Sequence, residues 1–154
     1  MDDIERAKKT FSTLCAYLDE VECPYEKNDE KLSISFTTAG DDLPIKIRVI
    51  VDSKKQLISL FSQIPVVVPE EKRLDLAIAV TVANNSLVDG CFDYDLSEGY
   101  IVYRMTSSFI ESEIGRDLFE YLMIVSCQTV DEYNDKFLML SKGLMSIEDF
   151  ISKE

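Results

Sequence analysis

Apolar residues in the first part of the chain recur first at helical spacing and then at every second position. From Asp3 to Val21 the spacing of three and four predicts a helix with one buried stripe: Ile4, Ala7, Phe11, Leu14, Cys15, Leu18 and Val21. Beyond Pro24 the period becomes two, which predicts two half-buried strands with Leu32, Ile34 and Phe36 in one and Ile45, Ile47, Val49 and Val51 in the other. The turn formers TTAGDDLP between them favour an antiparallel pair.

A third apolar run, Gln56 to Ile64, predicts another strand of the same sheet, with a bulge near Leu60 and Phe61. Pro65 and Pro69 limit its extension through Val66–Val68, because proline has no amide hydrogen to donate. Pro69 also suits the first turn of a following helix, where a missing donor is harmless.

The segment Leu74 to Val88 predicts a helix that is apolar on almost every side. Two opposite faces are apolar, one with Leu74, Ala77, Ile78 and Thr81 and the other with Leu76, Val80, Ala83 and Leu87. Such a helix is normally covered on both sides, so we expect it between the sheet and a second layer, either the later helices or a second subunit. We therefore mark the second face, Leu76, Val80, Ala83 and Leu87, as a candidate dimer or partner interface.

The acidic stretch DGCFDYDLSEGYIVYR, from Asp89 to Arg104, has two interpretations. Asp93, Asp95 and Ser97 resemble the first half of a calcium loop, but that loop needs glycine at position six and glutamate at position twelve, where this chain has Glu98 and Arg104. A hairpin fits better. Phe92, Tyr94 and Leu96 share one face of its first strand, Ile101, Tyr103 and Met105 share one face of its second, and Gly99 suits the turn.

From Ser112 onward the spacing is again helical, with one predicted face of Ile114, Leu118, Tyr121, Leu122 and Val125. Thr129 and Glu132 have the spacing of a capping box, which predicts a new helix start or a kink there. Gly143 is a natural helix stop. Ser146 and Asp149 predict a short last helix that carries Ile147, Phe150 and Ile151.

Composition and charge restrict the classes of partner. The chain has 154 residues, which we interpret as one domain, 1–154, and its 29 acidic and 16 basic residues give a net charge of −13. That charge repels nucleic acid and anionic lipid, so we expect neither nucleic acid nor a membrane as partner. Without an export signal, the four scattered cysteines, Cys15, Cys23, Cys91 and Cys127, indicate reduced thiols and a cytoplasmic protein.

The chain lacks the residues that most common catalytic mechanisms require. The chain contains no histidine, which excludes Ser-His and Cys-His nucleophile systems and the H-E-x-x-H metal site. No glycine-rich phosphate-binding motif occurs. Paired carboxylates or a reactive thiol are the routes left to catalysis. We therefore expect no enzyme, no cofactor and no metal site, and we assign no catalytic residue.

Two stretches resemble the YbjN family, whose fold is similar to that of the type III secretion chaperones. One is VANNSLVDGCFDYDLSEGYIVYR, with Asn84, Phe92, Asp95, Gly99 and Ile101, and the other is YNDKFLMLSKGLMSIEDFI, in which a helix carrying Tyr133 ends at Gly143. Where the family often has a proline near Tyr133, this chain has Asn134 and Asp135. The resemblance implies an α+β fold: a single antiparallel sheet with helices packed against it, in the order α-β-β-β-α-β-β-α-α. It also implies frequent dimers and, in the secretion chaperones, an extended client segment.

Two functional hypotheses follow. The first is a noncatalytic protein-binding or chaperone-like module whose partner is another protein or a second copy of itself; its first helix, a sheet edge or a dimer surface receives a polypeptide by apolar contact and strand addition. The second is a small-ligand-binding regulatory domain with a pocket between the helix at Leu74 and the sheet, polar groups there including Tyr94 or Tyr103.

Overall fold

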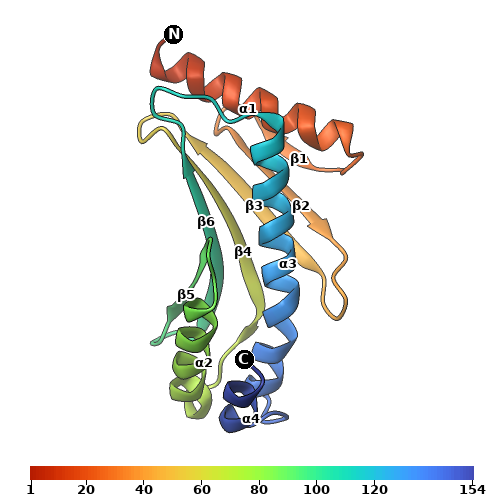
Figure 1. The fold of residues 1–154 in the computed structure, drawn as a ribbon, viewed down its shortest axis with the longest axis vertical. Coiled ribbons are helices and arrows are strands. Elements are labelled where there is room, and N and C mark those ends of the chain that lie inside the picture. The colour runs from red at the N-terminus through yellow and green to blue at the C-terminus, as the bar shows by residue number, and fades with distance from the viewer.

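The structure, a computed structural model of residues 1–154, is one six-stranded antiparallel sheet with helices on one of its faces (Figure 1). Its elements are α1 (Asp3–Glu20), β1 (Glu26–Asn28), β2 (Ser33–Thr38), β3 (Ile45–Asp52), β4 (Leu57–Val67), the 3₁₀ turn η1 (Glu70–Lys72), α2 (Arg73–Asn85), β5 (Cys91–Asp95), β6 (Tyr100–Ser108), α3 (Arg116–Ser141) and α4 (Ile147–Ser152). The strands lie in the order β1-β2-β3-β4-β6-β5. The predicted fold class is confirmed, with β1 as an additional strand.

Alternation along the strands separates a buried face from an uncovered one. The inward side chains of the central strands include Ile45, Ile47, Val49, Val51, Ile58, Leu60, Ile64, Ile101, Tyr103 and Met105, all of them buried. Val49 pairs with Leu60 and Leu60 with Met105, so the apolar residues form continuous rows across three strands. The helices cover these rows, and the outward positions of the same strands face away from every helix.

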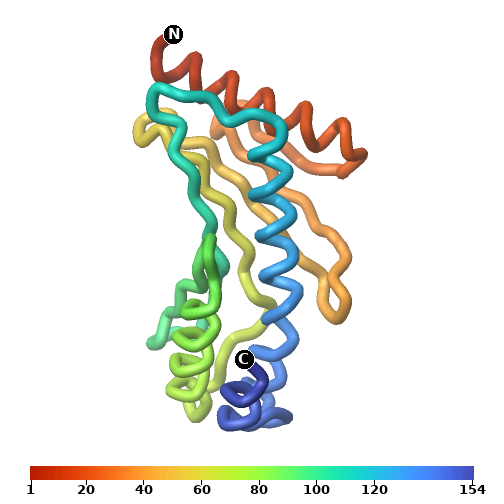
Figure 2. Tube along the Cα trace, viewed as in Figure 1, coloured from red at the N-terminus to blue at the C-terminus, as the bar shows by residue number.

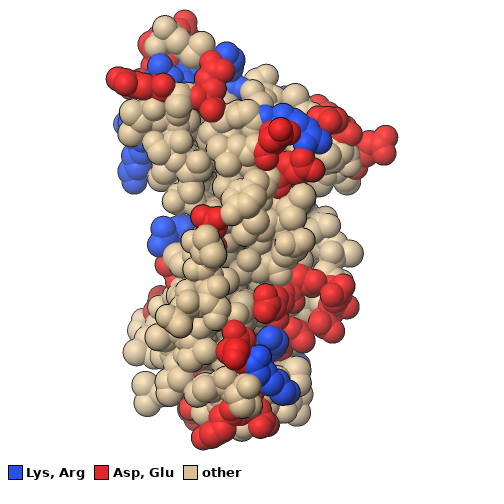
Figure 3. All heavy atoms as spheres, viewed as in Figure 1, with Lys and Arg blue, Asp and Glu red and all other residues tan.

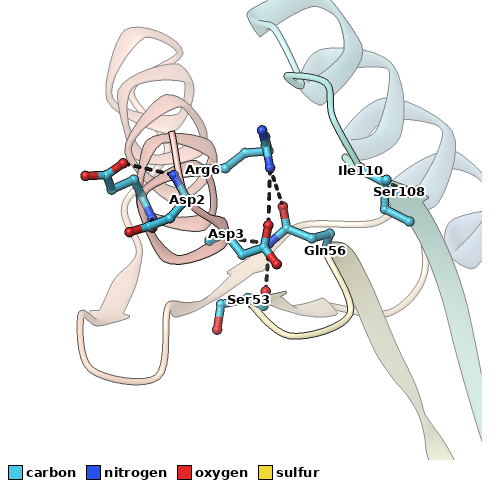
Figure 4. A network of polar contacts seen from close by, with 8 residues as sticks. Asp2, Asp3, Arg6, Ser53, Gln56, Ser108 and Ile110 are labelled. Atoms are coloured by element: carbon cyan, nitrogen blue, oxygen red, sulfur yellow. Dashed lines mark hydrogen bonds and ion pairs between the residues drawn. The ribbon is translucent and has the colours of Figure 1, made fainter.

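Helix α1 forms as predicted, except that Ile4 and Val21, at the two ends of the predicted buried stripe, are exposed. Side-chain hydrogen bonds fix its N-terminus. Asp2 accepts from the Glu5 amide at 2.8 Å, and Glu5 accepts from the Asp2 amide at 3.0 Å, which makes a capping box. Gln56, buried in the β3–β4 turn, donates to the carbonyls of Asp3 and Ser53, and Arg6 donates to its side-chain oxygen (Figure 4). The turn and the first helical turn of α1 are therefore held together.

Strand β4 is longer than the sequence predicts, and its irregularity lies elsewhere. It continues through Pro65 to Val67, and its pairing with β6 shifts register between Gln63 and Val67. The pairs around Leu60 and Phe61 are regular, so the predicted bulge there is wrong. Proline is tolerated in this central strand because the register shift leaves its position outside the ladder.

Helix α2 has one buried face and one open face. Leu76, Ala79, Val80 and Ala83 are buried, whereas Leu74 is 73% exposed and Ile78 45% exposed. The prediction that both faces are covered is therefore wrong for the single subunit. The physical reason is that β5, α3 and α4 all contact the same side of this helix.

Helix α3 is one uninterrupted helix of 26 residues, so the predicted start or kink at Thr129 is wrong. Thr129 is buried, and the helical spacing of buried residues continues past it to Tyr133 and Phe137, which favours helix over a capped break. The predicted stop is confirmed, since Gly143 has a φ of 72°. At α4, Ser146 accepts a hydrogen bond from the Asp149 amide at 3.1 Å, as predicted.

The two ends of the molecule are closed by different helices. In Figure 2 α1 lies across one end with the N-terminus, while α2 and α4 lie side by side at the other end, near the C-terminus. An aromatic cluster fills that second end: Phe92, Tyr133, Phe137 and Phe150, with neighbouring ring centroids 5.1 to 6.4 Å apart. All four rings are buried and belong to the one continuous hydrophobic core of the subunit. None of the helices combines the length and apolarity needed to cross a membrane.

Candidate functional site

One edge of the sheet is open for part of its length. Strand β1 has three residues and pairs with Ser33–Ser35 of β2, so β2 beyond Ser35 has no neighbour on that side. The Val51 amide donates to the Leu32 carbonyl, and pairing alternates along a strand, so the backbone of Phe36 and Thr38 faces β3. The amide hydrogen and carbonyl of Thr37 therefore face outward, where an added strand would pair with them.

The opposite edge is occupied by a side chain of the protein itself. Asn84, near the end of α2, donates to the Phe92 carbonyl at 3.0 Å and accepts from the Phe92 amide at 2.7 Å. Its amide makes the two hydrogen bonds that a neighbouring strand would make at this position. An added strand cannot pair with Phe92, so β5 is the less accessible edge.

Replacing Asn84 by alanine is expected to destabilise the protein and expose this edge. Two backbone groups of Phe92 lose their partners, which should cost about 1–3 kcal/mol of the free energy of unfolding. Urea denaturation measures that loss, and light scattering over a concentration series should show more self-association than in the wild type. An unchanged midpoint together with an unchanged mass would contradict the role assigned to Asn84.

The outer side of α3 carries an apolar stripe, which we define as Leu118, Tyr121, Ile124 and the adjoining loop residue Val88. The three helical side chains are between 39% and 45% exposed, and Val88 is 97% exposed. Tyr121 donates a hydrogen bond to the Asp89 carboxylate, which ties the loop to the helix. Figure 3 shows uncharged residues over the middle of this side, with Asp and Glu gathered toward its ends and along one margin.

The stripe corrects the face predicted for this helix. Ile114 and Leu122 are buried as predicted, but Leu118 and Tyr121 point away from the core. Apolar residues occupy more than one face of α3, so the spacing alone could not separate the buried face from the exposed one. Helix α1, by contrast, has its exposed large apolar residues, Ile4 and Val21, only at its two ends.

The residues marked as a candidate interface on α2 lie mainly inside the subunit. Leu76 and Ala83 have no exposed surface, Val80 is 6% exposed, and Leu87 packs half-buried against the core. Their neighbours are β5, α3 and α4 of the same chain. An interface on this helix would have to use the adjacent Leu74 and Ile78 instead.

The predicted ligand pocket between α2 and the sheet is wrong, because aromatic side chains occupy that space. Phe92 packs edge-to-face on Tyr133 and Phe137 with centroids 5.5 and 5.1 Å apart. Both tyrosines suggested for that pocket make structural hydrogen bonds: Tyr94 donates to the Arg73 carbonyl at 2.9 Å and Tyr103 to the Asp89 carbonyl at 3.3 Å. The larger hollows of the surface lie elsewhere.

The acidic stretch is a hairpin, as preferred from the sequence. Asp95 accepts from the amides of Ser97 and Glu98 at 3.0 and 3.1 Å, so its carboxylate holds the turn. Asp93 faces Arg104 on the paired strand at 2.7 Å, and the hydrogen bond from this arginine lowers the pKa of Asp93. Both aspartates therefore have structural partners within the hairpin.

The four thiols lack the features of an activated nucleophile. Burial raises the pKa of Cys15, Cys23 and Cys91, and it raises the pKa of Cys127 to about 11. The nucleophile is the thiolate, whose population at neutral pH falls as the thiol pKa rises. Catalysis through a thiol therefore has no support in this geometry.

Alkylation with iodoacetamide at pH 8 should accordingly be slow at Cys127 in the folded protein. With a pKa near 11 this thiol has roughly a hundredfold less thiolate than a thiol with a pKa of 9.0, and we expect labelling at least about tenfold slower than in urea. Mass spectrometry of digested samples measures each site separately. Labelling of Cys127 at the unfolded rate would show that the thiol is exposed and ionised.

Comparison with known proteins identifies similar folds and no close relative. No family model matches the chain, and no curated protein matches it. Solved structures do. YbjN from E. coli is 13% identical over 80% of this chain and 87% of its own, with a TM-score of 0.59.

Two further solved structures are complexes. The ExsC–ExsE complex matches with 14% identity over 86% of this chain and 93% of that chain, at a TM-score of 0.56. The HopA1–SchA chaperone–effector complex matches with 12% identity over 80% of this chain and 91% of that chain, at a TM-score of 0.53. Identities this low establish the fold alone. The chain has a YbjN-like, type III secretion chaperone-like fold.

Proposed function

We propose that the protein is a noncatalytic, chaperone-like module that binds an extended segment of another polypeptide in the cytoplasm. The observation that carries this proposal is the difference between the two sheet edges. Asn84 occupies the β5 edge at Phe92, whereas nothing pairs with Thr37 on the β2 edge. We therefore place the added strand of a partner beside Thr37 on β2.

Strand addition suits a protein that recognises an extended segment. Backbone hydrogen bonds supply affinity whatever the side chains of the segment are, and alternate side chains supply specificity through contacts beside the edge. The half-buried Phe36 lies next to Thr37 and offers such a contact. The apolar stripe on α3 offers a second, separate contact area, and the net charge of −13 favours a partner with basic flanks.

The similar folds support the proposed class of function, the binding of another protein. Two of the similar structures, ExsC–ExsE and HopA1–SchA, are complexes of two proteins, and the second is a chaperone with its effector. Neither comparison identifies the partner of this chain. The proposal rests on the open edge and takes from those proteins only the class of function.

A homodimer is a second proposal, supported by the exposed Leu74 and Ile78 on α2. These side chains lie beside the predicted interface face, and a large part of each is exposed in the single subunit. Light scattering on the purified protein decides the question, since a mass of twice 17.6 kDa supports the dimer and a monomer mass rejects it. The polypeptide-binding proposal does not depend on this result.

The test of polypeptide binding uses Thr37→Pro, with Thr37→Ala as its control. Proline removes the outward amide hydrogen and is accommodated at the outer edge of a sheet, whereas alanine keeps that hydrogen and removes the same hydroxyl. Both variants should unfold within about 1 kcal/mol of the wild type. Affinity purification from the native host should then recover the same partner with wild type and Thr37→Ala, and little of it with Thr37→Pro.

Equal recovery with both variants would refute strand addition at this edge. Recovery of no protein by any of the three would refute the polypeptide-binding function itself. In either case the fold assignment is unaffected.

A further inference from the structure

The uncovered face of the sheet contains a wide hollow. Its volume is about 730 Å³, and it is lined by outward side chains of four neighbouring strands together with Tyr25 at one side. Strands β2, β3, β4 and β6 contribute most of this lining and β1 adds Glu26, while the helices lie on the opposite face. A hollow of this size is within the range of small-molecule sites, about 300–1,000 Å³.

Apolar side chains from three adjacent strands meet in this hollow. Ile50 comes from β3, Phe61 from β4 and Val102 from β6. Phe61 is paired with Arg48 on one side and with Arg104 on the other, so its ring lies in a row between two arginines. Directly opposed side chains on a sheet are about 4.5–5.5 Å apart at Cβ, which places a guanidinium within reach of anything resting on the ring.

The charge of the hollow is opposite to that of the protein. Lys46 and Arg48 line it and Glu26 is its single carboxylate, so the lining has a net charge of +1 in a chain of −13. No ion pair in the structure includes Lys46 or Arg48. Arg104, by contrast, is satisfied by Asp93 at 2.7 Å. Two unpaired cations beside an apolar surface are what an anion with an apolar body requires.

We propose that this hollow binds a small organic anion with a flat apolar body, such as an aromatic carboxylate. Arg48 would bind the carboxylate through two parallel hydrogen bonds, Lys46 would add a second positive charge, and the body would rest on Phe61 and Val102. This proposal differs from the predicted pocket beside α2, which lies on the other face of the sheet. It is also independent of polypeptide binding, although Thr37 lines one wall of the hollow.

The experiment is a titration of the ¹⁵N-labelled full chain with 2-naphthoate, in which the amide chemical shifts are measured by NMR at each ligand concentration. The amides of Arg48, Ile50, Phe61 and Val102 should shift in a saturable way. The double variant Lys46→Gln/Arg48→Gln should bind about tenfold more weakly, because it removes charge-assisted hydrogen bonds. The control Lys54→Gln/Lys55→Gln changes the net charge equally in the exposed β3–β4 turn and should bind within about twofold of the wild type.

Neutral 2-naphthamide separates recognition of the anion from general apolar binding, and it should bind at least about fivefold more weakly than 2-naphthoate. The proposal is overturned if the shifts fall on the α3 stripe instead. It is equally overturned if the Lys46/Arg48 variant binds as the wild type does, or if no saturable shift occurs. Binding that survives in Thr37→Pro but fails in the Lys46/Arg48 variant distinguishes this site from the strand-addition edge.

Discussion

Replacing Phe137 by alanine is expected to lower the free energy of unfolding by about 3–5 kcal/mol. Phe137 has no exposed surface, and its ring contacts those of Phe92, Tyr133 and Phe150. Truncation removes the apolar contacts of one ring and leaves a cavity where α3, α4 and the sheet meet. Urea denaturation followed by circular dichroism measures the loss.

The matched control for this variant is Ile151→Ala on α4, where the side chain is 46% exposed. It should cost less than about 1 kcal/mol, since little apolar contact is lost at the surface. A small loss at Phe137, comparable with that at Ile151, would mean that the aromatic cluster is not the core of this end of the molecule.

Replacing Gly99 by alanine is expected to destabilise the hairpin strongly, by about 2–4 kcal/mol. Gly99 has a φ of +80°, which L side chains rarely adopt, and a Cβ there would lie 2.5 Å from the Val68 carbonyl oxygen. The Val68 amide also donates to the Gly99 carbonyl at 2.9 Å, so the two backbones cannot separate without losing a hydrogen bond. Thermal unfolding should show a clear decrease in the melting temperature.

Gly115→Ala provides the comparison for the same chemical change. Gly115 has a φ of −83° at the N-cap of α3, and a Cβ there meets no atom within 4 Å. We expect a change of no more than about 0.5 kcal/mol. If both glycine variants lose stability equally, the close approach of the hairpin to Val68 is not the reason why position 99 requires glycine.

The sequence predicts those parts of the fold in which one periodicity dominates. The helix at Asp3–Val21 and the strands at Ile34 and Val49 have a single apolar face each, and the structure confirms them. The hairpin was predictable for a different reason, since Gly99 supplies the backbone conformation that the turn requires. Local chemistry therefore sufficed for most elements and their order.

Prediction failed where a helix is apolar on more than one side. On α2 the opposite faces of Leu76 and Ile78 look alike in the sequence, and only the position of α3 and α4 decides that Leu76 is buried and Ile78 exposed. On α3 the same ambiguity leads to a wrong prediction, because Leu118 and Tyr121 are placed on the predicted apolar face but are exposed. Helical periodicity identifies an apolar face, but it does not say how many neighbours are present to cover it.

The candidate surfaces were harder to predict because they depend on pairings between distant segments. Glu26–Asn28 has no apolar alternation, so nothing in the sequence marks β1 as a strand or shows that it ends opposite Ser35. Asn84 belongs to the stretch that resembles the YbjN family, but its hydrogen bonds to Phe92 follow from the packing of α2 beside β5. Arg48 in the hollow similarly becomes a neighbour of Phe61 only through the strand register.

Amide hydrogen exchange at Thr37, followed by NMR, tests the open sheet edge most directly. In the free protein the Thr37 amide should exchange quickly, while those of Phe36 and Thr38, which face β3, should be protected. In the complex with the partner recovered from the host, Thr37 should become protected as well. A Thr37 amide that is already protected in the free protein, or one that still exchanges quickly in the complex, would contradict strand addition at this edge.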